Sequence, residues 1–145
     1  MTNTDENSKR RPEPAKSDFP PSCVSAFIAL ETQSFKIRAE RHPLFARQAE
    51  WRVLCALTLA SLEDRATDIT TLVADSGMAR STVKRVIDLL VQRNEVRLER
   101  STSDRRRLMV IQNPDSLQAV VATLQDLIAV TFEFSDNKRN RPGTA

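Results

Sequence analysis

Glycine, histidine and cysteine are scarce in this 145-residue sequence, and their scarcity excludes several kinds of site. The two glycines do not form a Gly-rich phosphate loop, because P-loop and dinucleotide motifs each need two or more at fixed spacing. One histidine and two cysteines are too few for a zinc site with three or four nitrogen and sulfur ligands. Nothing near His42, the only imidazole, resembles the setting of a catalytic nucleophile. We therefore expect neither an enzyme nor a bound cofactor.

Signals for secretion and membrane insertion are also missing from the sequence. The N-terminus is polar and charged, without the apolar stretch of a signal peptide. The longest apolar-rich stretch, 51–62, is interrupted by Arg52 and is too short to span a bilayer. Cys23 and Cys55 do not suggest a disulfide framework. We expect a soluble cytoplasmic protein with reduced thiols.

Positive charge is concentrated in one part of the chain. Residues 77–107 carry nine basic and four acidic side chains, a net charge of +5, whereas 108–134 carry three acidic and no basic ones. The polar ends, 1–18 and 135–145, have almost nothing to bury, so we expect disordered tails, the second one basic. Residues 19–134 then form a single domain with a segment whose charge suits a polyanion.

Apolar residues recur at helical spacing over most of this domain. The spacing predicts helices over 23–41, 44–62, 69–76, 80–93 and 114–134. Ser22 and Asp68 are the expected N-caps of the first and third helices. Pro43 ends the first helix, and Gly77 can supply the left-handed turn that ends the third.

Two short β-like runs, 95–100 and 107–112, flank the polar turn 101–106 and predict a hairpin. The order is therefore helix, helix, helix–turn–helix, hairpin, helix. This order predicts a mainly α fold with one small β-hairpin. Its architecture is a winged helix–turn–helix with flanking N- and C-terminal helices that serve dimerisation.

Motifs spread over residues 51–114 resemble those of a known family. Trp51-Arg52-Val53-Leu54 opens the second long helix, and Gly77–Val83 spans the turn and the start of the next helix. Val96 is followed eight residues later by Asp104-Arg105-Arg106, and Pro114 begins the last helix. Together these motifs resemble the MarR family of winged-helix transcription regulators. The resemblance covers under half of the chain, which ends one helix earlier than family members do.

The resemblance implies a homodimer that binds a pseudo-palindromic DNA operator. It also implies that the recognition helix, 80–93, enters the major groove. Arg106 of the wing, 100–107, would enter the minor groove, oriented by Asp104. No residue set in the sequence requires a small-molecule effector.

The chemistry of the recognition helix is compatible with DNA. Arg80, Lys84 and Arg85 share its polar face, and arginine can pair bidentately with guanine O6 and N7. Ser81 and Thr82 stand at its start, where hydroxyls and a helix N-terminus favour phosphate. The alternative is an ordinary solvated helix face.

Basic residues also crowd the wing, where we expect Arg100, Arg105, Arg106 and Arg107 to contact DNA. Like charges at a hairpin tip repel one another unless an anion relieves them. Asp104 can pair with one arginine and fix its direction, and a narrow minor groove attracts such a side chain. The alternative is a charged turn that prevents edge-strand aggregation.

The flanking helices suggest a second type of contact. Their apolar stripes form core first, and we expect them also to build a dimer interface. The interface residues would be Val24, Phe27, Ile28, Leu117, Val121, Leu124 and Ile128. Cys23 lies near a helix N-terminus, a setting that raises the reactivity of a thiol, so it is a candidate redox site; the alternative is a plain buried cysteine.

Three functions remain open from the sequence. The first is a dimeric transcriptional regulator, most simply a repressor, of a bacterium or its phage or plasmid. The second is a winged helix used as a protein-interaction adaptor or an inhibitor of the transcription machinery, because fold does not fix function. The third is a plasmid or phage replication or partition factor, which would also bind DNA.

Overall fold

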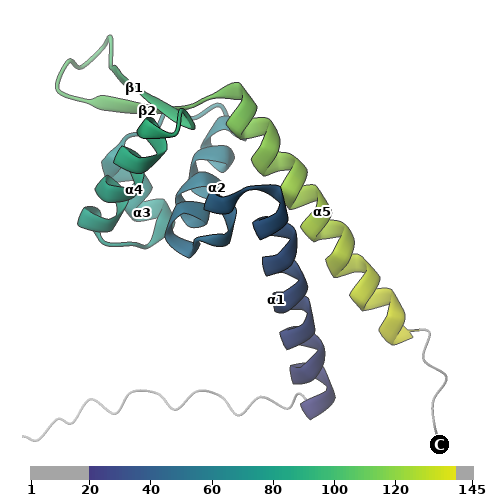
Figure 1. The fold of residues 1–145 in the computed structure, drawn as a ribbon. Coiled ribbons are helices and arrows are strands. Elements are labelled where there is room, and N and C mark those ends of the chain that lie inside the picture. The colour runs from purple at the N-terminus through teal and green to yellow at the C-terminus, as the bar shows by residue number, and fades with distance from the viewer. Residues whose placement is uncertain (1–19, 140–145) are drawn as a thin grey trace, which may run out of the picture.

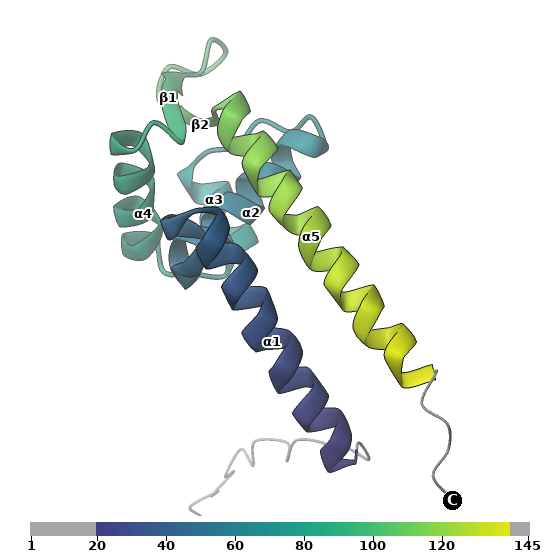
Figure 2. The same cartoon turned by 45° about the vertical axis from the view of Figure 1, so that its right-hand side comes forward.

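The computed structural model describes residues 20–139 and has one two-stranded sheet among five α-helices and a short 3-10 helix. In chain order the elements are α1 (Pro21–Arg41), η1 (Pro43–Ala46), α2 (Gln48–Leu62), α3 (Ile69–Ser76), α4 (Arg80–Gln92), β1 (Val96–Arg100), β2 (Leu108–Gln112) and α5 (Pro114–Arg139). The mainly α fold with one hairpin is therefore confirmed. Helices α2–α4 and the hairpin form a body, from which α1 and α5 extend side by side as an arm (Figures 1 and 2).

The first two helices differ from the expectation at their starts. Helix α1 begins at Pro21 with Pro20 as N-cap, so Ser22 does not cap it. Proline suits the first helical turn because its φ is already helical and it lacks an N–H that would have no partner there. The predicted helix 44–62 is split into η1 and α2 because the backbone is extended at Arg47. The break allows Leu44 and Phe45 to be buried.

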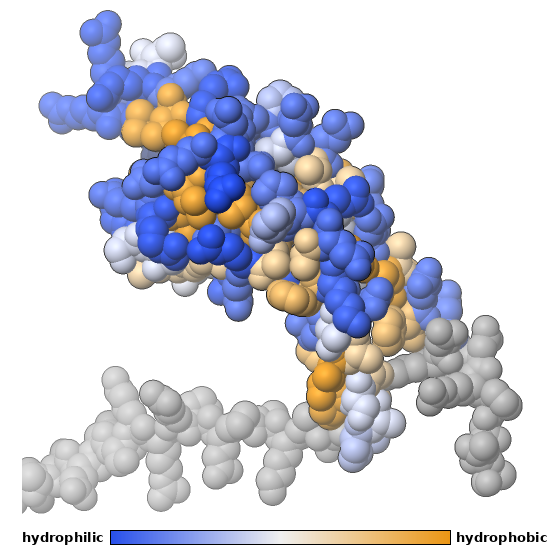
Figure 3. All heavy atoms as spheres, in the orientation of Figure 1, coloured by the Kyte–Doolittle hydropathy of each residue, from blue (hydrophilic) through white to orange (hydrophobic). Residues whose placement is uncertain are grey.

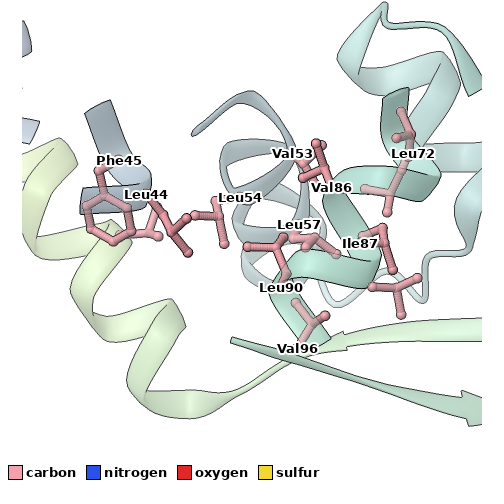
Figure 4. Packing of buried hydrophobic residues seen from close by; sticks show 13 residues of the cluster. Leu44, Phe45, Val53, Leu54, Leu57, Leu72, Val86, Ile87, Leu90 and Val96 are labelled. Atoms are coloured by element: carbon pink, nitrogen blue, oxygen red, sulfur yellow. The ribbon is translucent and has the colours of Figure 1, made fainter. Parts of the chain in front are cut away.

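The core lies where α2 crosses α3, α4 and the base of the hairpin (Figure 4). Its fully buried side chains include Leu54, Leu57, Leu72, Ile87 and Leu90. On α4 the buried residues are Val83, Val86, Ile87 and Leu90, at i, i+3, i+4 and i+7. This spacing buries one face of α4 and exposes the other.

A buried chain of polar side chains joins three elements. Thr58 Oγ1 on α2 donates to Gln112 Oε1 on β2 at 3.2 Å, and Gln112 Nε2 donates to Ser116 Oγ on α5 at 3.3 Å. Each side chain satisfies a neighbour that would otherwise be buried without a hydrogen bond. These hydrogen bonds therefore fix the end of β2, the body and the arm relative to one another.

Three short side-chain or backbone signals set the helix–turn–helix and the hairpin. Asp68 Oδ1 accepts the N–H of Thr71 at 2.9 Å and caps α3, as predicted. Gly77 has φ +68° after α3, and Asn94 has φ +58° between α4 and β1. Both residue types tolerate this left-handed conformation. The chain can therefore reverse direction within a few residues at both places.

The hairpin is fastened to the helix–turn–helix along strand β2. Strands β1 and β2 are antiparallel, with Leu98 opposite Val110 and Arg100 opposite Leu108. The segment before α3 adds a third short edge: Asp68 forms a bridge with Met109, and Val110 N–H donates to Thr67 O at 2.9 Å. The direction of the wing is thus tied to the start of α3.

Helix α5 differs from the sequence-based expectation in two respects, its C-terminal end and its length and composition. It continues to Arg139, so the first residues of the predicted tail 135–145 are helical, while 1–18 and 140–145 lie outside the described residues. Among the described residues it is also the one helix long and apolar enough to cross a membrane, over Pro114–Asp136. The expectation that no segment spans a membrane was drawn from the stretch 51–62 and did not consider this helix. Length and composition are weak evidence for insertion.

Truncation of a core residue on α2 should destabilise the protein strongly. We expect Leu54→Ala to lower the free energy of unfolding by roughly 2–5 kcal/mol, because Leu54 is fully buried. Leu62→Ala is the control on the same helix; Leu62 is 64% exposed, and its truncation should cost under about 0.5 kcal/mol. Urea denaturation followed by circular dichroism at one protein concentration measures both, and equal effects would contradict this core.

Candidate nucleic-acid interface

The outer face of α4 is polar and basic. Arg80, Ser81, Lys84 and Arg85 are exposed, and Thr82 is half-buried. The four buried residues of α4 leave this face to solvent, so the sequence-predicted set lies together. In Figure 3 most of the visible surface around α4 and the hairpin is hydrophilic, with smaller apolar patches between, and further apolar patches lie along the arm.

The side chains on this face of α4 differ in their contacts with the rest of the protein. Arg80 Nη1 donates to Thr70 Oγ1 of α3 at 3.2 Å, which ties the start of α4 to α3. Ser81, Lys84 and Arg85 line a shallow, open depression of about 650 Å³, together with Arg47, Asp88, Leu89 and Gln92. The depression provides a basic surface between α4 and the start of α2.

Sequence reasoning missed two residues at or beside this depression. Arg47 is the N-cap of α2, and Glu50 lies in the first turn of that helix. Glu50 Oε1 is 3.3 Å from Arg47 Nε and 3.8 Å from Arg85 Nη1. Nothing in the sequence distinguishes Glu50 from a surface glutamate, because its proximity to α4 comes from packing between helices.

The wing turn is shaped by its own polar groups. Asp104 Oδ1 accepts the backbone N–H of Arg106 at 3.0 Å, and Arg107 N–H donates to Asp104 O at 3.0 Å. Arg100 Nη1 donates to Arg105 O at 3.1 Å. Asp104 was expected to orient an arginine side chain, but in this structure its carboxylate shapes the turn. Among residues 20–136, no acidic partner is found for the side chains of Arg105 and Arg106.

The side chain of Arg107 has a different environment from those of Arg105 and Arg106. Its Nε and Nη2 atoms lie 2.9 and 2.8 Å from Asp68 Oδ2. The hydrogen bonds from Thr71, followed by those from Arg107, lower the pKa of the Asp68 carboxyl below its ordinary value of 3.8. Arg107 thus braces the base of the wing against α3, with its guanidinium still about half exposed.

The predicted dimer residues fall into two groups along the arm. Val24, Phe27 and Ile28 on α1 and Ile128 on α5 are exposed, each by more than half. Leu117, Val121 and Leu124 on α5 are half-buried within the chain. Phe35 and Phe132, which belong to the same apolar stripes, are also exposed. The arm therefore presents a large apolar surface that one chain leaves uncovered.

The two cysteines have distinct surroundings. Burial raises the pKa of the Cys55 thiol to about 11, only partly opposed by Arg38, so this thiol stays protonated and unreactive at neutral pH. Cys23 is half-buried in the first turn of α1. Within the part of the chain that the structure describes, no group of three or more His, Cys, Asp or Glu side chains could hold a metal ion.

Acid should loosen the brace between the wing and α3. A carboxylate whose pKa is lowered by folding stabilises the fold above its unfolded pKa, and the contribution is lost as the pH falls below 3.8 through the folded pKa. Asp68→Asn keeps an N-capping side chain but loses the charge that binds Arg107. We expect it to lower the unfolding free energy at pH 7 by about 1 kcal/mol and to flatten the loss of stability between pH 4 and pH 2.

The control for this variant is Asp75→Asn at the other end of α3, where the carboxylate is 3.7 Å from Arg65. Thermal unfolding from pH 2 to pH 7 compares the three proteins. If Asp68→Asn kept the acid dependence of the wild type, the brace would not contribute to stability.

Comparison with known proteins identifies the fold. Neither a protein-family model nor a curated protein sequence matches the chain. Among solved structures, S. aureus MepR in its DNA complex is 12% identical with a TM-score of 0.63, covering 82% of this chain and 92% of that one. E. coli MarR in its apo form is 17% identical with a TM-score of 0.57, covering 83% and 87%. A further MarR family transcription regulator is 15% identical with a TM-score of 0.62, covering 81% and 76%. These likenesses and the helix–turn–helix with its hairpin show that the chain has the winged-helix fold of the MarR transcription regulators.

Proposed function

We propose that this protein is a dimeric, sequence-specific regulator of transcription that binds double-stranded DNA, most simply as a repressor. The observation that carries the proposal is a set of basic side chains without acidic partners. Lys84 on α4 and Arg105 and Arg106 on the wing are exposed and form no ion pair among the described residues. Clustered cations without acidic partners repel one another, and this repulsion is relieved when they neutralise the phosphates of a nucleic acid.

The two elements would contact different parts of the duplex. Helix α4 has its basic face outward and suits the major groove, where Arg85 can pair with guanine and Ser81 and Lys84 can contact phosphate. The wing, 100–107, suits the minor groove, into which Arg105 or Arg106 can insert. Arg107 and Asp104 then support the wing from within the protein, through the hydrogen bonds described above.

The neighbours in structure support the same function. MepR was solved in a complex with DNA, and other neighbours are described as transcription regulators. These chains share the fold at 12–15% identity, so DNA binding by the present chain rests on its own basic surface. Because none of the described residues forms a recognisable catalytic arrangement, we favour a DNA-binding protein over an enzyme.

A second copy of the chain is the simplest partner that would bury the exposed apolar surface of the arm. The exposed apolar residues of α1 and α5 form stripes of a kind that monomers seldom leave in water. A two-fold dimer would bury both arms and present two α4 helices to one duplex. Its operator would then have two half-sites about one helical turn apart.

Selection of duplexes from a randomised library at physiological salt tests the DNA partner. We expect enrichment of an inverted repeat. On the selected site, Arg106→Ala and the double variant Lys84→Ala/Arg85→Ala should weaken binding by roughly tenfold or more. They should also reduce the salt slope by about one for each side chain that no longer neutralises a phosphate. Lys36→Ala on the exposed side of α1 is the charge-matched control.

Two results would overturn the assignment. Unchanged affinity of the variants would remove α4 and the wing from the interface. Weak, salt-sensitive binding without any enriched sequence would instead favour the protein-interaction adaptor.

A charge placed on the arm should separate the copies. Phe27 is 61% exposed, and we expect Phe27→Asp to convert a dimer to a monomer in light scattering while the circular dichroism spectrum is retained. Gln33→Asp introduces the same charge on an exposed position of α1 away from the stripe and should leave the dimer intact. A wild-type protein that is monomeric at micromolar concentration would refute the proposed interface.

A further inference from the structure

Glu50 is a buried carboxylate that the stability of the fold does not explain. The residue is 2% exposed, and its Oε1 atom is buried without a hydrogen bond among the described residues. Removing a carboxylate from water costs several kcal/mol unless charges or hydrogen bonds compensate. The N-terminus of α2 favours a negative charge, but typically by only about 0.3–1 kcal/mol.

The compensation for Glu50 comes from two arginines that are themselves in water. Arg47 Nε lies 3.3 Å and Arg85 Nη1 lies 3.8 Å from Glu50 Oε1, and their side chains are 54% and 58% exposed. The carboxylate is therefore rigid while both cations are on the surface. Arg85 belongs to α4, whereas Arg47 and Glu50 belong to the start of α2.

We propose that Glu50 is a specificity-determining positioning residue, whose buried carboxylate holds the Arg85 guanidinium at the DNA-facing depression so that it reads a base. The inference rests on the proposed function and deepens it. Glu50 itself does not touch DNA in this arrangement. Arg47, held by the same carboxylate, adds a phosphate contact from outside the helix–turn–helix.

The geometry of arginine allows both interactions at once. A guanidinium has five N–H donors, so one edge can face Glu50 while another pairs with guanine O6 and N7. An exposed arginine loses conformational entropy when it binds DNA. A fixed carboxylate that already orders the side chain in the free protein lowers this cost. A negative charge near the interface also weakens attraction to any phosphate. Glu50 should therefore increase discrimination between sequences and reduce non-specific affinity.

The test compares specific with non-specific binding. Glu50→Gln keeps the shape and removes the charge. We expect it to tighten binding to a scrambled duplex and to lower the ratio of operator to scrambled affinity by roughly fivefold, near the lower end of what one arginine–guanine pair contributes. The operator is the site selected with the wild-type protein, and thermal unfolding checks that the variant is folded.

Two controls separate this role from a change of charge or stability. Glu63→Gln makes the same charge change at the far end of α2, where the side chain is about half exposed, and should leave the ratio unchanged. In the Arg85→Ala background, Glu50→Gln should no longer change the ratio, because the residue through which it acts is gone.

Each outcome decides the proposal. An unchanged ratio in Glu50→Gln, or the same fall with and without Arg85, would refute the positioning role while the enriched operator still supported the regulator. Failure of the wild-type protein to select any sequence would instead refute the proposed function itself.

Discussion

The direction of the wing depends on one carboxylate, Asp68. Its Oδ1 caps α3 by accepting the N–H of Thr71, its Oδ2 accepts hydrogen bonds from Arg107, the residue before β2, and its backbone forms a bridge with Met109. One residue therefore sets the start of the helix–turn–helix and anchors the hairpin. Because α3 also packs on α4, the wing and the basic face of α4 keep a fixed relation that neither could have alone.

Charge at the interface is arranged at two depths. Lys84, Arg105 and Arg106 lie at the surface, where they can attract any nucleic acid. Glu50 lies beneath the surface and opposes the same attraction, but it also orders Arg85. Asp104 and Asp68 similarly shape the wing rather than neutralise its tip. In the proposed function, acidic groups inside the site would thus exchange general affinity for nucleic acid for a defined geometry of the arginines that read the sequence.

Much of the fold was predictable because its signals are local. Asp68 as N-cap, Gly77 and Asn94 in the left-handed conformation, and Pro114 at the start of α5 follow from the chemistry of those residues. The helix pattern also predicted which side chains of α4 would face solvent. The prediction was wrong where competing local signals occur together: Pro20 rather than Ser22 is the N-cap of α1, and the helix is interrupted at Arg47, which allows Leu44 and Phe45 to be buried.

The order of elements, the winged-helix fold and the basic faces of α4 and the wing follow from the amino-acid sequence alone, since hydrophobic period, caps and charge are properties of neighbouring residues. The partners of those charges depend on the tertiary structure. Arg107 meets Asp68 across 39 positions of sequence, and Arg85 meets Glu50 from a different helix. Such pairs arise from how α2, α3, α4 and the hairpin pack, because charged side chains of one type are equivalent until packing makes one of them buried or close to a partner.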